Sequence, residues 1–271
     1  MPELPEVETT CRGIEPHILG KTITDTIIRT AKLRWPIPGK LADKLKKQKI
    51  TAVQRRGKYL LISVKPGTLI IHLGMSGSLR ILPSKTPAGG HDHFDLVFGK
   101  QCLRLRDPRK FGAVLWQPGK AEDHKLLSSL GPEPLSEAFD TDYLFGKSRK
   151  RQVSIKNLIM NAHVVVGVGN IYASESLFRA GIRPTSRAGK ISRARYARLV
   201  DSIKQVLTEA ISQGGTTLQD FSNEDGKPGY FAQKLNVYGR EGEACYGCDA
   251  PIQQIKIGQR SSYYCPRCQK T

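Results

Sequence analysis

The sequence lacks any run of about 18 apolar residues, the length that a membrane-spanning helix needs. It also lacks a strongly amphipathic basic helix of the kind that lies on a membrane surface. Its first residues are acidic, whereas a secretory signal begins with basic residues followed by an apolar stretch. From these absences we expect no membrane partner and a soluble protein that works inside the cell, in the cytoplasm.

Acidic residues are scarce relative to basic ones. The 271 residues include 43 Lys and Arg but only 24 Asp and Glu, so the formal net charge is +19. Solubility alone needs a net charge of only about 2–8 on a small domain. Such an excess favours a polyanionic partner such as a nucleic acid, with a merely solubilising role as the alternative. The hydrophobic content of 39% is enough for a packed core.

Cysteine is sparse except near the C-terminus. Of the 6 cysteines, Cys11 and Cys102 lie far apart in the sequence, and we expect them to be free core thiols in a reducing compartment. The other four form two C-x2-C pairs with sixteen residues between them: Cys245, Cys248, Cys265 and Cys268. This spacing is typical of a tetrahedral zinc site with four thiolate ligands. Such a site has no open coordination position, so we expect one structural zinc ion, with two disulfides as the alternative.

The segment between the two cysteine pairs predicts a hairpin that carries Lys256 and Arg260. A hairpin fixed by zinc can point an arginine at a phosphate group. A solvated charge on a loop explains the same residues equally well.

Apolar residues recur at three- and four-residue spacing from residue 3 to residue 19, which predicts a leading helix. Short apolar runs separated by turn residues follow up to about Trp116 and predict an antiparallel sandwich or barrel. After the LGPEPL segment (130–135) the pattern becomes helical, with helices predicted over 154–166, 170–181 and 192–215. The sequence therefore predicts three parts: a β-rich part, a helical part and a small cysteine module.

The chain begins MPELPEVE, and this start is unusual in its chemistry. Pro5 and Glu6 suit the first turn of a helix, but that reading does not explain Pro2. If Met1 is removed, Pro2 carries a terminal secondary amine, and an ordinary terminal amine has a pKa of roughly 7.7–8.0. A useful fraction is then neutral, and its attack on a sugar C1′ or on an aldehyde gives an iminium intermediate. Glu3 is adjacent and suits an acid–base role.

Other segments carry residues suited to a nucleic acid. Lys58 begins an apolar strand beside Gly57, which favours a partly desolvated amine, with a strand-end surface lysine as the alternative. Met75 lies between glycines, and Phe111 follows two basic residues. Apolar wedges beside arginine are what a protein needs to enter a base stack. Asn170 is expected to be the N-cap of a helix after a Gly-rich turn, where backbone N–H groups suit phosphate, although a buried helix–helix turn fits equally well.

The HDH triplet at residues 91–93 has the residue types of a metal site. A third clear ligand is missing from the sequence around it, so phosphate contact or strand-edge packing is the favoured interpretation of His91 and His93.

Eleven motifs run in order through the whole chain: MPELPEVET, RRGKYL, HLGMSGSLR, HDHFDL, DPRKFG, LGPEPL, VGVGNIYASESLF, GGTTL, DGKPGYF, VYGR and the four-cysteine module. Together they closely resemble bacterial formamidopyrimidine-DNA glycosylase, which removes 8-oxoguanine and formamidopyrimidines from DNA. The resemblance implies an α+β multidomain fold. It consists of an N-terminal antiparallel β-sandwich with a leading helix (1–130), a helix–two-turn–helix DNA-binding domain (131–235) and a zinc finger (236–271).

The resemblance also implies roles for individual residues. Pro2 is the expected nucleophile and Glu3 its acid–base partner, with Lys58 in β-elimination and Arg260 in δ-elimination and phosphate binding. The expected DNA contacts are Met75, His91, Arg109, Phe111, Arg151, Lys156 and Asn170, of which Met75, Arg109 and Phe111 would fill the gap left by the flipped base. The loop from Thr216 to Tyr230, which includes Gln219, would close over the lesion. The expected partner is double-stranded DNA with a damaged base, bound by a monomer near the bacterial nucleoid, and no redox or nucleotide cofactor is expected.

Two other functions fit parts of the same pattern. Endonuclease VIII shares the Pro-Glu start and the zinc finger but prefers oxidised pyrimidines, and the PELPEVE start with Met75, Arg109 and Phe111 favours the purine enzyme. A non-catalytic DNA-binding zinc-ribbon protein explains the net charge and the cysteines. It leaves Pro2, Glu3 and Lys58 unexplained.

Overall fold

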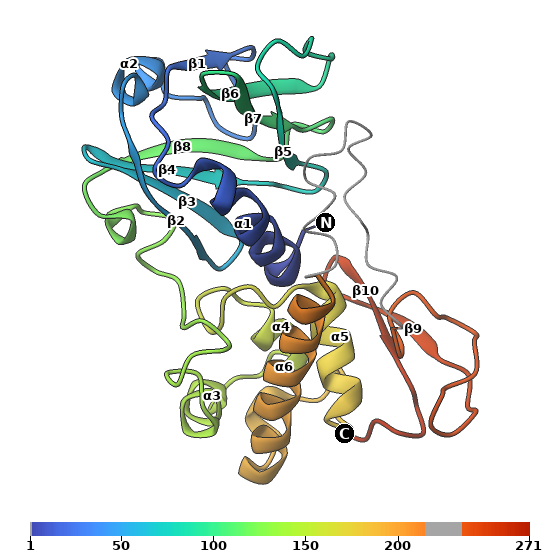
Figure 1. The fold of residues 1–271 in the computed structure, drawn as a ribbon. Helices are drawn as coiled ribbons and strands as arrows, with labels where there is room; N and C mark the ends of the chain where they lie inside the picture. Colours follow the sequence, from blue (N-terminus) through green and yellow to red (C-terminus); the bar gives the residue numbers. More distant parts are fainter. Residues whose placement is uncertain (1, 215–234) are drawn as a thin grey trace. The chain divides into compact units, whose positions relative to one another are not determined.

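The computed structural model describes residues 2–214 and 235–271, and these form two compact units. The N-terminal unit extends to Ser129, and the C-terminal unit contains Leu130–Ser212 together with the segment from residue 235 onward. Each unit has its own hydrophobic core. Figure 1 shows the helices and strands of both units. Within the described residues, no helix is both long and apolar enough to span a bilayer.

The N-terminal unit is a β-sandwich with a leading helix. Its elements are α1 (Leu4–Ile18), β1 (Asp25–Ile28), α2 (Leu41–Leu45), β2 (Ile50–Arg56), β3 (Tyr59–Val64), β4 (Gly67–His72), β5 (Ser78–Pro83), β6 (Asp92–Phe98), β7 (Gln101–Arg106), β8 (Ala113–Pro118) and a 3-10 turn at Ala121–Asp123. One sheet has the order β1-β6-β7-β5 and the other β2-β3-β4-β8. Every strand pair is antiparallel. The predicted sandwich is therefore confirmed, and the barrel alternative is wrong.

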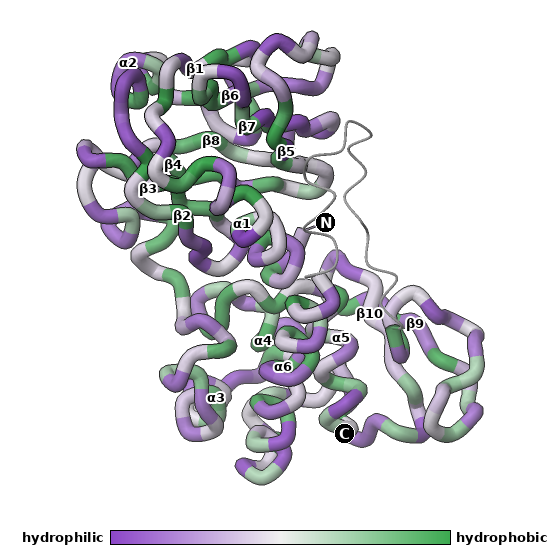
Figure 2. Tube along the Cα trace, in the orientation of Figure 1, coloured by the Kyte–Doolittle hydropathy of each residue, from purple (hydrophilic) through white to green (hydrophobic). Residues whose placement is uncertain are grey.

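Helix α1 covers one side of this sandwich. It contacts β2 and β5, which are edge strands of the two different sheets. Its buried residues Leu4, Val7 and Ile14 recur at helical spacing, as the sequence predicted. Val7 and Ile14 join residues from both sheets in a single core cluster. Hydrophobic stretches along β3 and β4 stand out in Figure 2. The helix thus places the N-terminal residues at the rim of the sandwich.

The C-terminal unit packs helices against a small hairpin module. Its elements are α3 (Thr141–Ser148), α4 (Ile155–Ile159), α5 (Asn170–Arg179), a 3-10 turn at Ala188–Lys190, α6 (Arg193–Gly214), β9 (Gln253–Ile257) and β10 (Arg260–Tyr264). The helical core includes Tyr172, Leu177 and Tyr196. Strands β9 and β10 form the predicted antiparallel hairpin, and β10 contacts α5.

Two local predictions in this unit are wrong. The helix predicted over 154–166 is only α4, because the chain turns after Met160 and the β-branched Val164–Val166 stretch is buried in the core as a turn. The N-cap of α5 is Gly169, and Asn170 is the first residue of the helix. Glycine accepts the extended backbone of the cap position, which leaves the Asn170 side chain available for another partner.

Candidate active site

The start of α1 holds the two N-terminal candidates. Glu3 is the N-cap of the helix and is almost fully buried, with 1% of its surface exposed. Its backbone N–H donates to Glu6 Oε2 at 2.7 Å, and its side chain accepts from the backbone of Glu6, which forms a capping box. Pro2 directly precedes this cap and is half-buried. The capping box therefore fixes the position of Pro2 relative to the helix.

Lys58 lies in the two-residue turn between β2 and β3. Gly57 precedes it with a φ of 57°, which suits the tight turns that join antiparallel strands. Arg55 donates to Gly57 O at 3.0 Å and to Glu8 Oε2 at 2.7 Å. One arginine thus ties the turn that carries Lys58 to helix α1, which carries Pro2 and Glu3.

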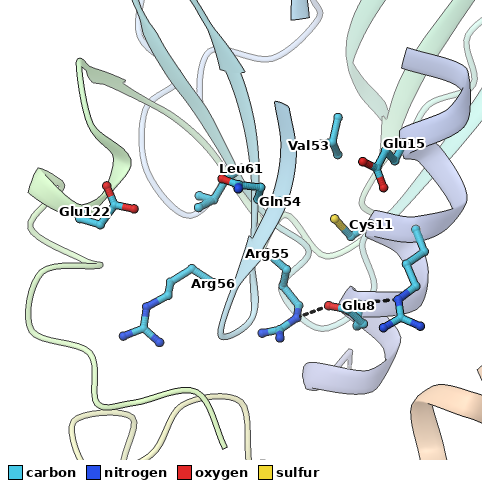
Figure 3. Close-up of a pocket in the computed structure, with 10 residues that line it drawn as sticks. Glu8, Cys11, Glu15, Val53, Gln54, Arg55, Arg56, Leu61 and Glu122 are labelled. Carbon is cyan, nitrogen blue, oxygen red and sulfur yellow. Dashed lines mark hydrogen bonds and ion pairs between the residues drawn. The ribbon is translucent and has the colours of Figure 1, made fainter. Parts of the chain in front are cut away.

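Glu8 receives a second ion pair from Arg12 on its own helix, at 2.7 Å (Figure 3). Burial alone would raise the pKa of Glu8, but hydrogen bonds from Arg55 and Arg12 lower it below its ordinary value. Glu8 is therefore ionised at neutral pH. The sequence analysis noticed neither Glu8 nor Arg55 as a structural link, since the two residues are 47 positions apart.

The Glu8 ion pairs line an open pocket of about 460 Å³ in the N-terminal unit (Figure 3). Its walls carry both signs of charge, from Glu15, Arg56 and Glu122 among others. Cys11 lines it as well, and burial raises the pKa of this thiol to about 12, so it stays protonated. None of the predicted site residues lines this pocket.

His72 lies between the Lys58 turn and the Met75 turn. Its ring contacts Tyr59, with 4.9 Å between ring centroids. Burial, and then the positive charges of Lys58 and Arg34, lower the pKa of His72 to about 4, so it is neutral at pH 7. Its Nδ1 accepts a hydrogen bond from Gly74 N at 3.1 Å, which places the ring proton on Nε2.

Met75, Arg109 and Phe111 lie on two turns that meet closely. The Arg109 guanidinium lies 4.8 Å from the centroid of the Phe111 ring. Met75 and Phe111 are 38% and 45% exposed, which is unusual for large apolar side chains. Gly74 has a φ of +65°, and a Cβ there would lie 2.4 Å from the Phe111 carbonyl carbon. The structure therefore brings these three predicted residues onto one part of the N-terminal unit.

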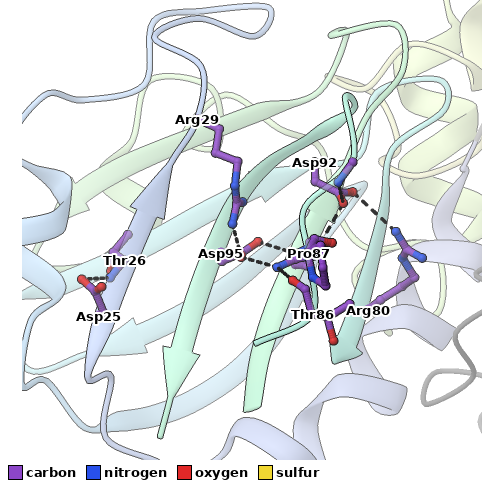
Figure 4. A network of polar contacts seen from close by, with 10 residues as sticks. Asp25, Thr26, Arg29, Arg80, Thr86, Pro87, Asp92 and Asp95 are labelled. Atoms are coloured by element: carbon purple, nitrogen blue, oxygen red, sulfur yellow. Dashed lines mark hydrogen bonds and ion pairs between the residues drawn. The ribbon is translucent and has the colours of Figure 1, made fainter. Parts of the chain in front are cut away.

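His91 is exposed directly before β6, at the end of a loop held by a buried ion-pair network (Figure 4). Arg104, which is 1% exposed, donates to the carbonyl oxygens of Thr86 and Pro87 at 3.0 and 3.1 Å and pairs with Asp95. Asp92 accepts from Gly89 N at 2.8 Å. These contacts anchor the loop on both sides of the segment that leads to His91.

A metal site at the HDH triplet is not supported. Asp92 pairs with Arg80 and Arg104, and His93 is buried with its Nε2 3.0 Å from Asp107 O. Within residues 2–214 and 235–271, the one cluster of potential metal ligands is formed by the four C-terminal cysteines.

Asn170, Lys156 and Arg260 converge in the C-terminal unit. Asn170 Nδ2 donates to Ser261 O at 3.0 Å. Lys156, 1% exposed, donates to Ser262 Oγ at 2.7 Å and to Ser261 O at 3.2 Å. Arg260 is exposed at the start of β10, next to Ser261. Helix α5 and the residues of α4 thus hold the hairpin at the position of Arg260.

The remaining predicted residue of this unit is Arg151. It is exposed just before α4, and its backbone N–H donates to Ser148 O at 3.0 Å. The predicted lesion-closing loop, Thr216–Tyr230 with Gln219, lies outside the described residues.

Glu175 is a buried residue of α5 that the sequence analysis missed. It is 4% exposed and accepts four hydrogen bonds of 2.8–3.0 Å from the segment Asn236–Tyr238. Tyr238 in turn packs against Tyr263 of β10, with ring centroids 5.0 Å apart. A carboxylate within the buried face of an amphipathic helix was the available signal.

The four cysteines form a compact group of sulfur atoms. All four Sγ atoms lie within 4.8 Å of one another. Cys245 and Cys268 are 3.9 Å apart, and Cys248 and Cys265 are 3.4 Å apart. A tetrahedral Zn–S site with bonds of about 2.3 Å has sulfur–sulfur distances of about 3.8 Å. The disulfide alternative is wrong, because an S–S bond is about 2.05 Å long. Cys11 and Cys102 are buried free thiols, as predicted.

The structure thus consists of a β-sandwich with a capped leading helix, a helical unit and a hairpin that carries four clustered cysteines. Family models support each part. The formamidopyrimidine-DNA glycosylase N-terminal domain matches residues 1–114, its H2TH domain residues 130–222, and a zinc finger found in FPG and IleRS residues 242–271. The chain therefore belongs to the formamidopyrimidine-DNA glycosylase family, and the expected α+β fold and single structural zinc are confirmed.

Relatives and solved structures agree with this assignment. Formamidopyrimidine-DNA glycosylases of Thioalkalivibrio sulfidiphilus and Cellvibrio japonicus are 60% and 56% identical to the chain, each over the full length of both proteins. The Lactococcus lactis Fpg in complex with DNA containing an abasic site has a TM-score of 0.90 at 34% identity, covering 100% of both chains. MutM (Fpg) from Thermus thermophilus has a TM-score of 0.85 at 37% identity, covering 99% of this chain and 98% of that one. The activity of the family is that of a DNA glycosylase in repair.

Proposed function

We propose that the protein removes oxidised purines, 8-oxoguanine and formamidopyrimidines, from double-stranded DNA and then cleaves the strand at the resulting abasic site. The observation that carries this proposal is the N-terminus, where a buried capping box holds Pro2 and Glu3 at the start of α1. A solved relative was crystallised with DNA containing Fapy-dG, which supports the same class of substrate.

In the proposed reaction, Pro2 is the nucleophile after removal of Met1. Its secondary amine attacks C1′ of the damaged nucleotide, and the bond from C1′ to the base breaks. The released base leaves with a proton. The C1′–O4′ bond of the sugar then breaks, O4′ takes up the proton that the proline nitrogen loses, and the ring-opened sugar remains joined to Pro2 as an iminium ion. Glu3 acts as the acid–base group for these proton transfers. Its burial beside Pro2 supports this role.

The iminium then drives strand cleavage. It acidifies the C2′ proton, and loss of that proton expels the 3′ phosphate in β-elimination. A second elimination expels the 5′ phosphate. We assign proton transfer in the first elimination to Lys58 and the second elimination, with phosphate binding, to Arg260. The exposure of Arg260 on a zinc-anchored hairpin supports a role that requires reaching the DNA backbone.

The proposed DNA contacts divide by chemistry. A base inside a duplex must be extruded before its C1′ can be attacked, at a cost of a few kcal/mol. We assign Met75, Arg109 and Phe111 to the gap that the base leaves, and the exposure of Met75 and Phe111 supports this. We assign phosphate contacts to the polar residues His91, Arg151 and Asn170, whereas the predicted DNA contact of Lys156 is assigned differently. Because Lys156 is buried against Ser262, we place its contribution in holding the hairpin that presents Arg260.

The protein is proposed to act as a monomer in the cytoplasm, at the nucleoid, with three functional parts at 1–130, 131–235 and 236–271.

Duplexes that differ in one base test the proposed function. The protein is incubated with 8-oxoguanine opposite cytosine, with guanine opposite cytosine, and with an oxidised pyrimidine in the same sequence. We expect release of 8-oxoguanine and strand breaks with phosphate at both ends, little reaction with guanine, and loss of all cleavage in Pro2→Gly. Preference for the oxidised pyrimidine would indicate the endonuclease VIII specificity. Full cleavage by Pro2→Gly would overturn the proline mechanism.

A further inference from the structure

The three residues that are assigned to the gap left by the extruded base come from two different turns. Met75 lies in the turn between β4 and β5, whereas Arg109 and Phe111 lie in the turn between β7 and β8. Both turns carry exposed side chains, and a loosely held pair of turns could not present them in one arrangement. Something must therefore hold the two turns in register before DNA arrives.

Asp107 lies at the junction of the two turns. It directly follows β7 and is completely buried, with 0% of its surface exposed. Its Oδ1 accepts from Ser76 Oγ at 2.9 Å, and its Oδ2 accepts from Gly112 N at 2.7 Å. A buried carboxylate is costly unless its oxygens are hydrogen-bonded. Here one oxygen serves each turn, so the same carboxylate binds both.

The Ser76 hydroxyl completes the link. While it donates to Asp107, it also accepts from Arg109 N at 3.3 Å. Ser76 is the neighbour of Met75 in the chain. One hydrogen bond therefore connects the side chain next to Met75 with the backbone of Arg109, and a second connects it with the carboxylate of Asp107.

The backbone of Asp107 reaches a third predicted segment. Its N–H donates to His91 O at 2.9 Å, and its carbonyl accepts from Lys110 N at 3.2 Å. Lys110 has a φ of 55°, in the left-handed region that residues other than glycine rarely adopt. The hydrogen bonds around Asp107 hold this turn in that conformation.

The space around the carboxylate is as restricted as its hydrogen bonding. A Cβ on Gly112 would lie 2.9 Å from Asp107 Oδ2 and 2.7 Å from His72 O. A Cβ on Gly74 would collide with the backbone of Phe111. Only glycine at these two positions allows the turns to approach as they do.

We propose that Asp107 and Ser76 are positioning residues that hold Met75, Arg109 and Phe111 ready to enter the base stack, and thereby set the rate of base extrusion. Neither touches the reacting atoms in the proposed mechanism, so their effect on the reaction passes through the two turns. This inference rests on the proposed function, in which those three side chains replace the extruded base.

The test compares two substrates in single-turnover kinetics. One duplex carries 8-oxoguanine opposite cytosine, so a base must be extruded and released. The other carries an abasic site opposite cytosine, which has no base to extrude. We expect Ser76→Ala to slow release of 8-oxoguanine about tenfold, the scale of one or two lost hydrogen bonds, and to slow cleavage at the abasic site less than twofold. Asp107→Asn should show the same selectivity with a larger loss, about 30-fold.

Three matched variants distinguish a loss of positioning from a general loss of protein stability. Ser76→Thr keeps the hydroxyl and should restore most of the rate. Ser84→Ala removes another serine hydroxyl of the same unit that bonds a backbone carbonyl, Gly99 O at 3.0 Å, and should react like the wild type on both duplexes. In an Arg109→Ala background, Ser76→Ala should cause less than its full loss, because the Ser76 hydroxyl acts in part by holding Arg109.

Two results would overturn the inference while leaving the proposed function intact. One is an unchanged 8-oxoguanine rate in Ser76→Ala, and the other is an equal loss on both duplexes. If Asp107→Asn does not fold, the rates of Ser76→Ala and Ser76→Thr on the two duplexes still test the positioning role. Wild-type protein that cleaves neither duplex would overturn the proposed function, and the inference with it. Pro2→Gly, which should lose both reactions, distinguishes a chemical defect from a positioning defect.

Discussion

Individual residues of the N-terminal unit carry charges that connect distant segments. Glu8 is the clearest case, because it pairs with Arg12 on its own helix and with Arg55 on β2. Its side chain is 19% exposed and that of Arg55 is 11% exposed. A pair that is shielded from water to this extent is worth more than an open surface pair. It contributes to the placement of α1, and therefore of Pro2.

Replacing Glu8 with Gln should reveal this contribution through pH. Because the pKa of Glu8 is lowered in the folded state, its stabilising effect is fully present above the ordinary value of 4.5 and is lost as the pH falls through the lower folded value. We expect Glu8→Gln to reduce the free energy of unfolding by about 1 kcal/mol at pH 7. The difference from the wild type should shrink below about pH 4.5.

Urea unfolding at a series of pH values measures this difference. Glu15→Gln, on the same helix, is the matched control and should change the free energy of unfolding little at pH 7. A constant difference between Glu8→Gln and the wild type from pH 7 to pH 3 would contradict the assignment of the ion pair.

At the scale of elements, α5 organises the C-terminal unit. Its first residue, Asn170, contacts the hairpin, and its buried Glu175 receives the backbone of Asn236–Tyr238. The hairpin and the Asn236–Tyr238 segment that leads to the cysteine module are therefore both held by one ten-residue helix.

Glu175→Gln should destabilise this unit. The amide has one oxygen instead of two, and its NH₂ group would face backbone N–H donors. We expect a loss of about 2 kcal/mol in the free energy of unfolding, measured by urea titration. Glu209→Gln, which removes an exposed pair with Arg179, should change stability by no more than about 0.5 kcal/mol. Equal effects of the two variants would contradict the role of Glu175.

Zinc should stabilise the β9–β10 hairpin rather than the whole chain. Chelation is expected to remove amide-exchange protection from β9 and β10, because the thiolates would lose the ion that holds them together. Protection in the sandwich strands β3 and β4 should persist. Unchanged protection of the hairpin in protein shown by metal analysis to be free of zinc would contradict the structural role.

The elements were largely predictable from the sequence, and the links between them were not. Helix α1 and most strands follow from apolar periodicity, and the zinc hairpin follows from cysteine spacing. The roles of Asp107, Glu175 and Arg55 depend on hydrogen bonds to groups far away in the sequence, some in side chains and some in the backbone. Ser76 and Asp107 are 31 residues apart, for example. Periodicity records which face of an element is buried, and it does not record which backbone group a buried side chain will meet.

At the scale of the whole molecule, the chain combines a strongly basic composition with two separate cores. The N-terminal unit carries Pro2, Glu3 and Lys58, and the C-terminal unit carries Asn170 and Arg260. The proposed reaction uses residues from both units on one DNA substrate, which agrees with a net charge of +19. In the proposed mechanism, this reaction begins with a covalent bond between the Pro2 nitrogen and C1′ of the damaged nucleotide.

Borohydride trapping identifies the residue that forms this bond. The full chain, with its N-terminus identified by mass spectrometry, is mixed with a duplex that carries 8-oxoguanine opposite cytosine, reduced and digested. Reduction converts an iminium to a stable amine, so the cross-linked peptide identifies the nucleophile. We expect a DNA adduct on the peptide that begins at Pro2. An adduct on a lysine instead, or no adduct from protein that begins at Pro2 and still releases the base, would contradict the proposed mechanism.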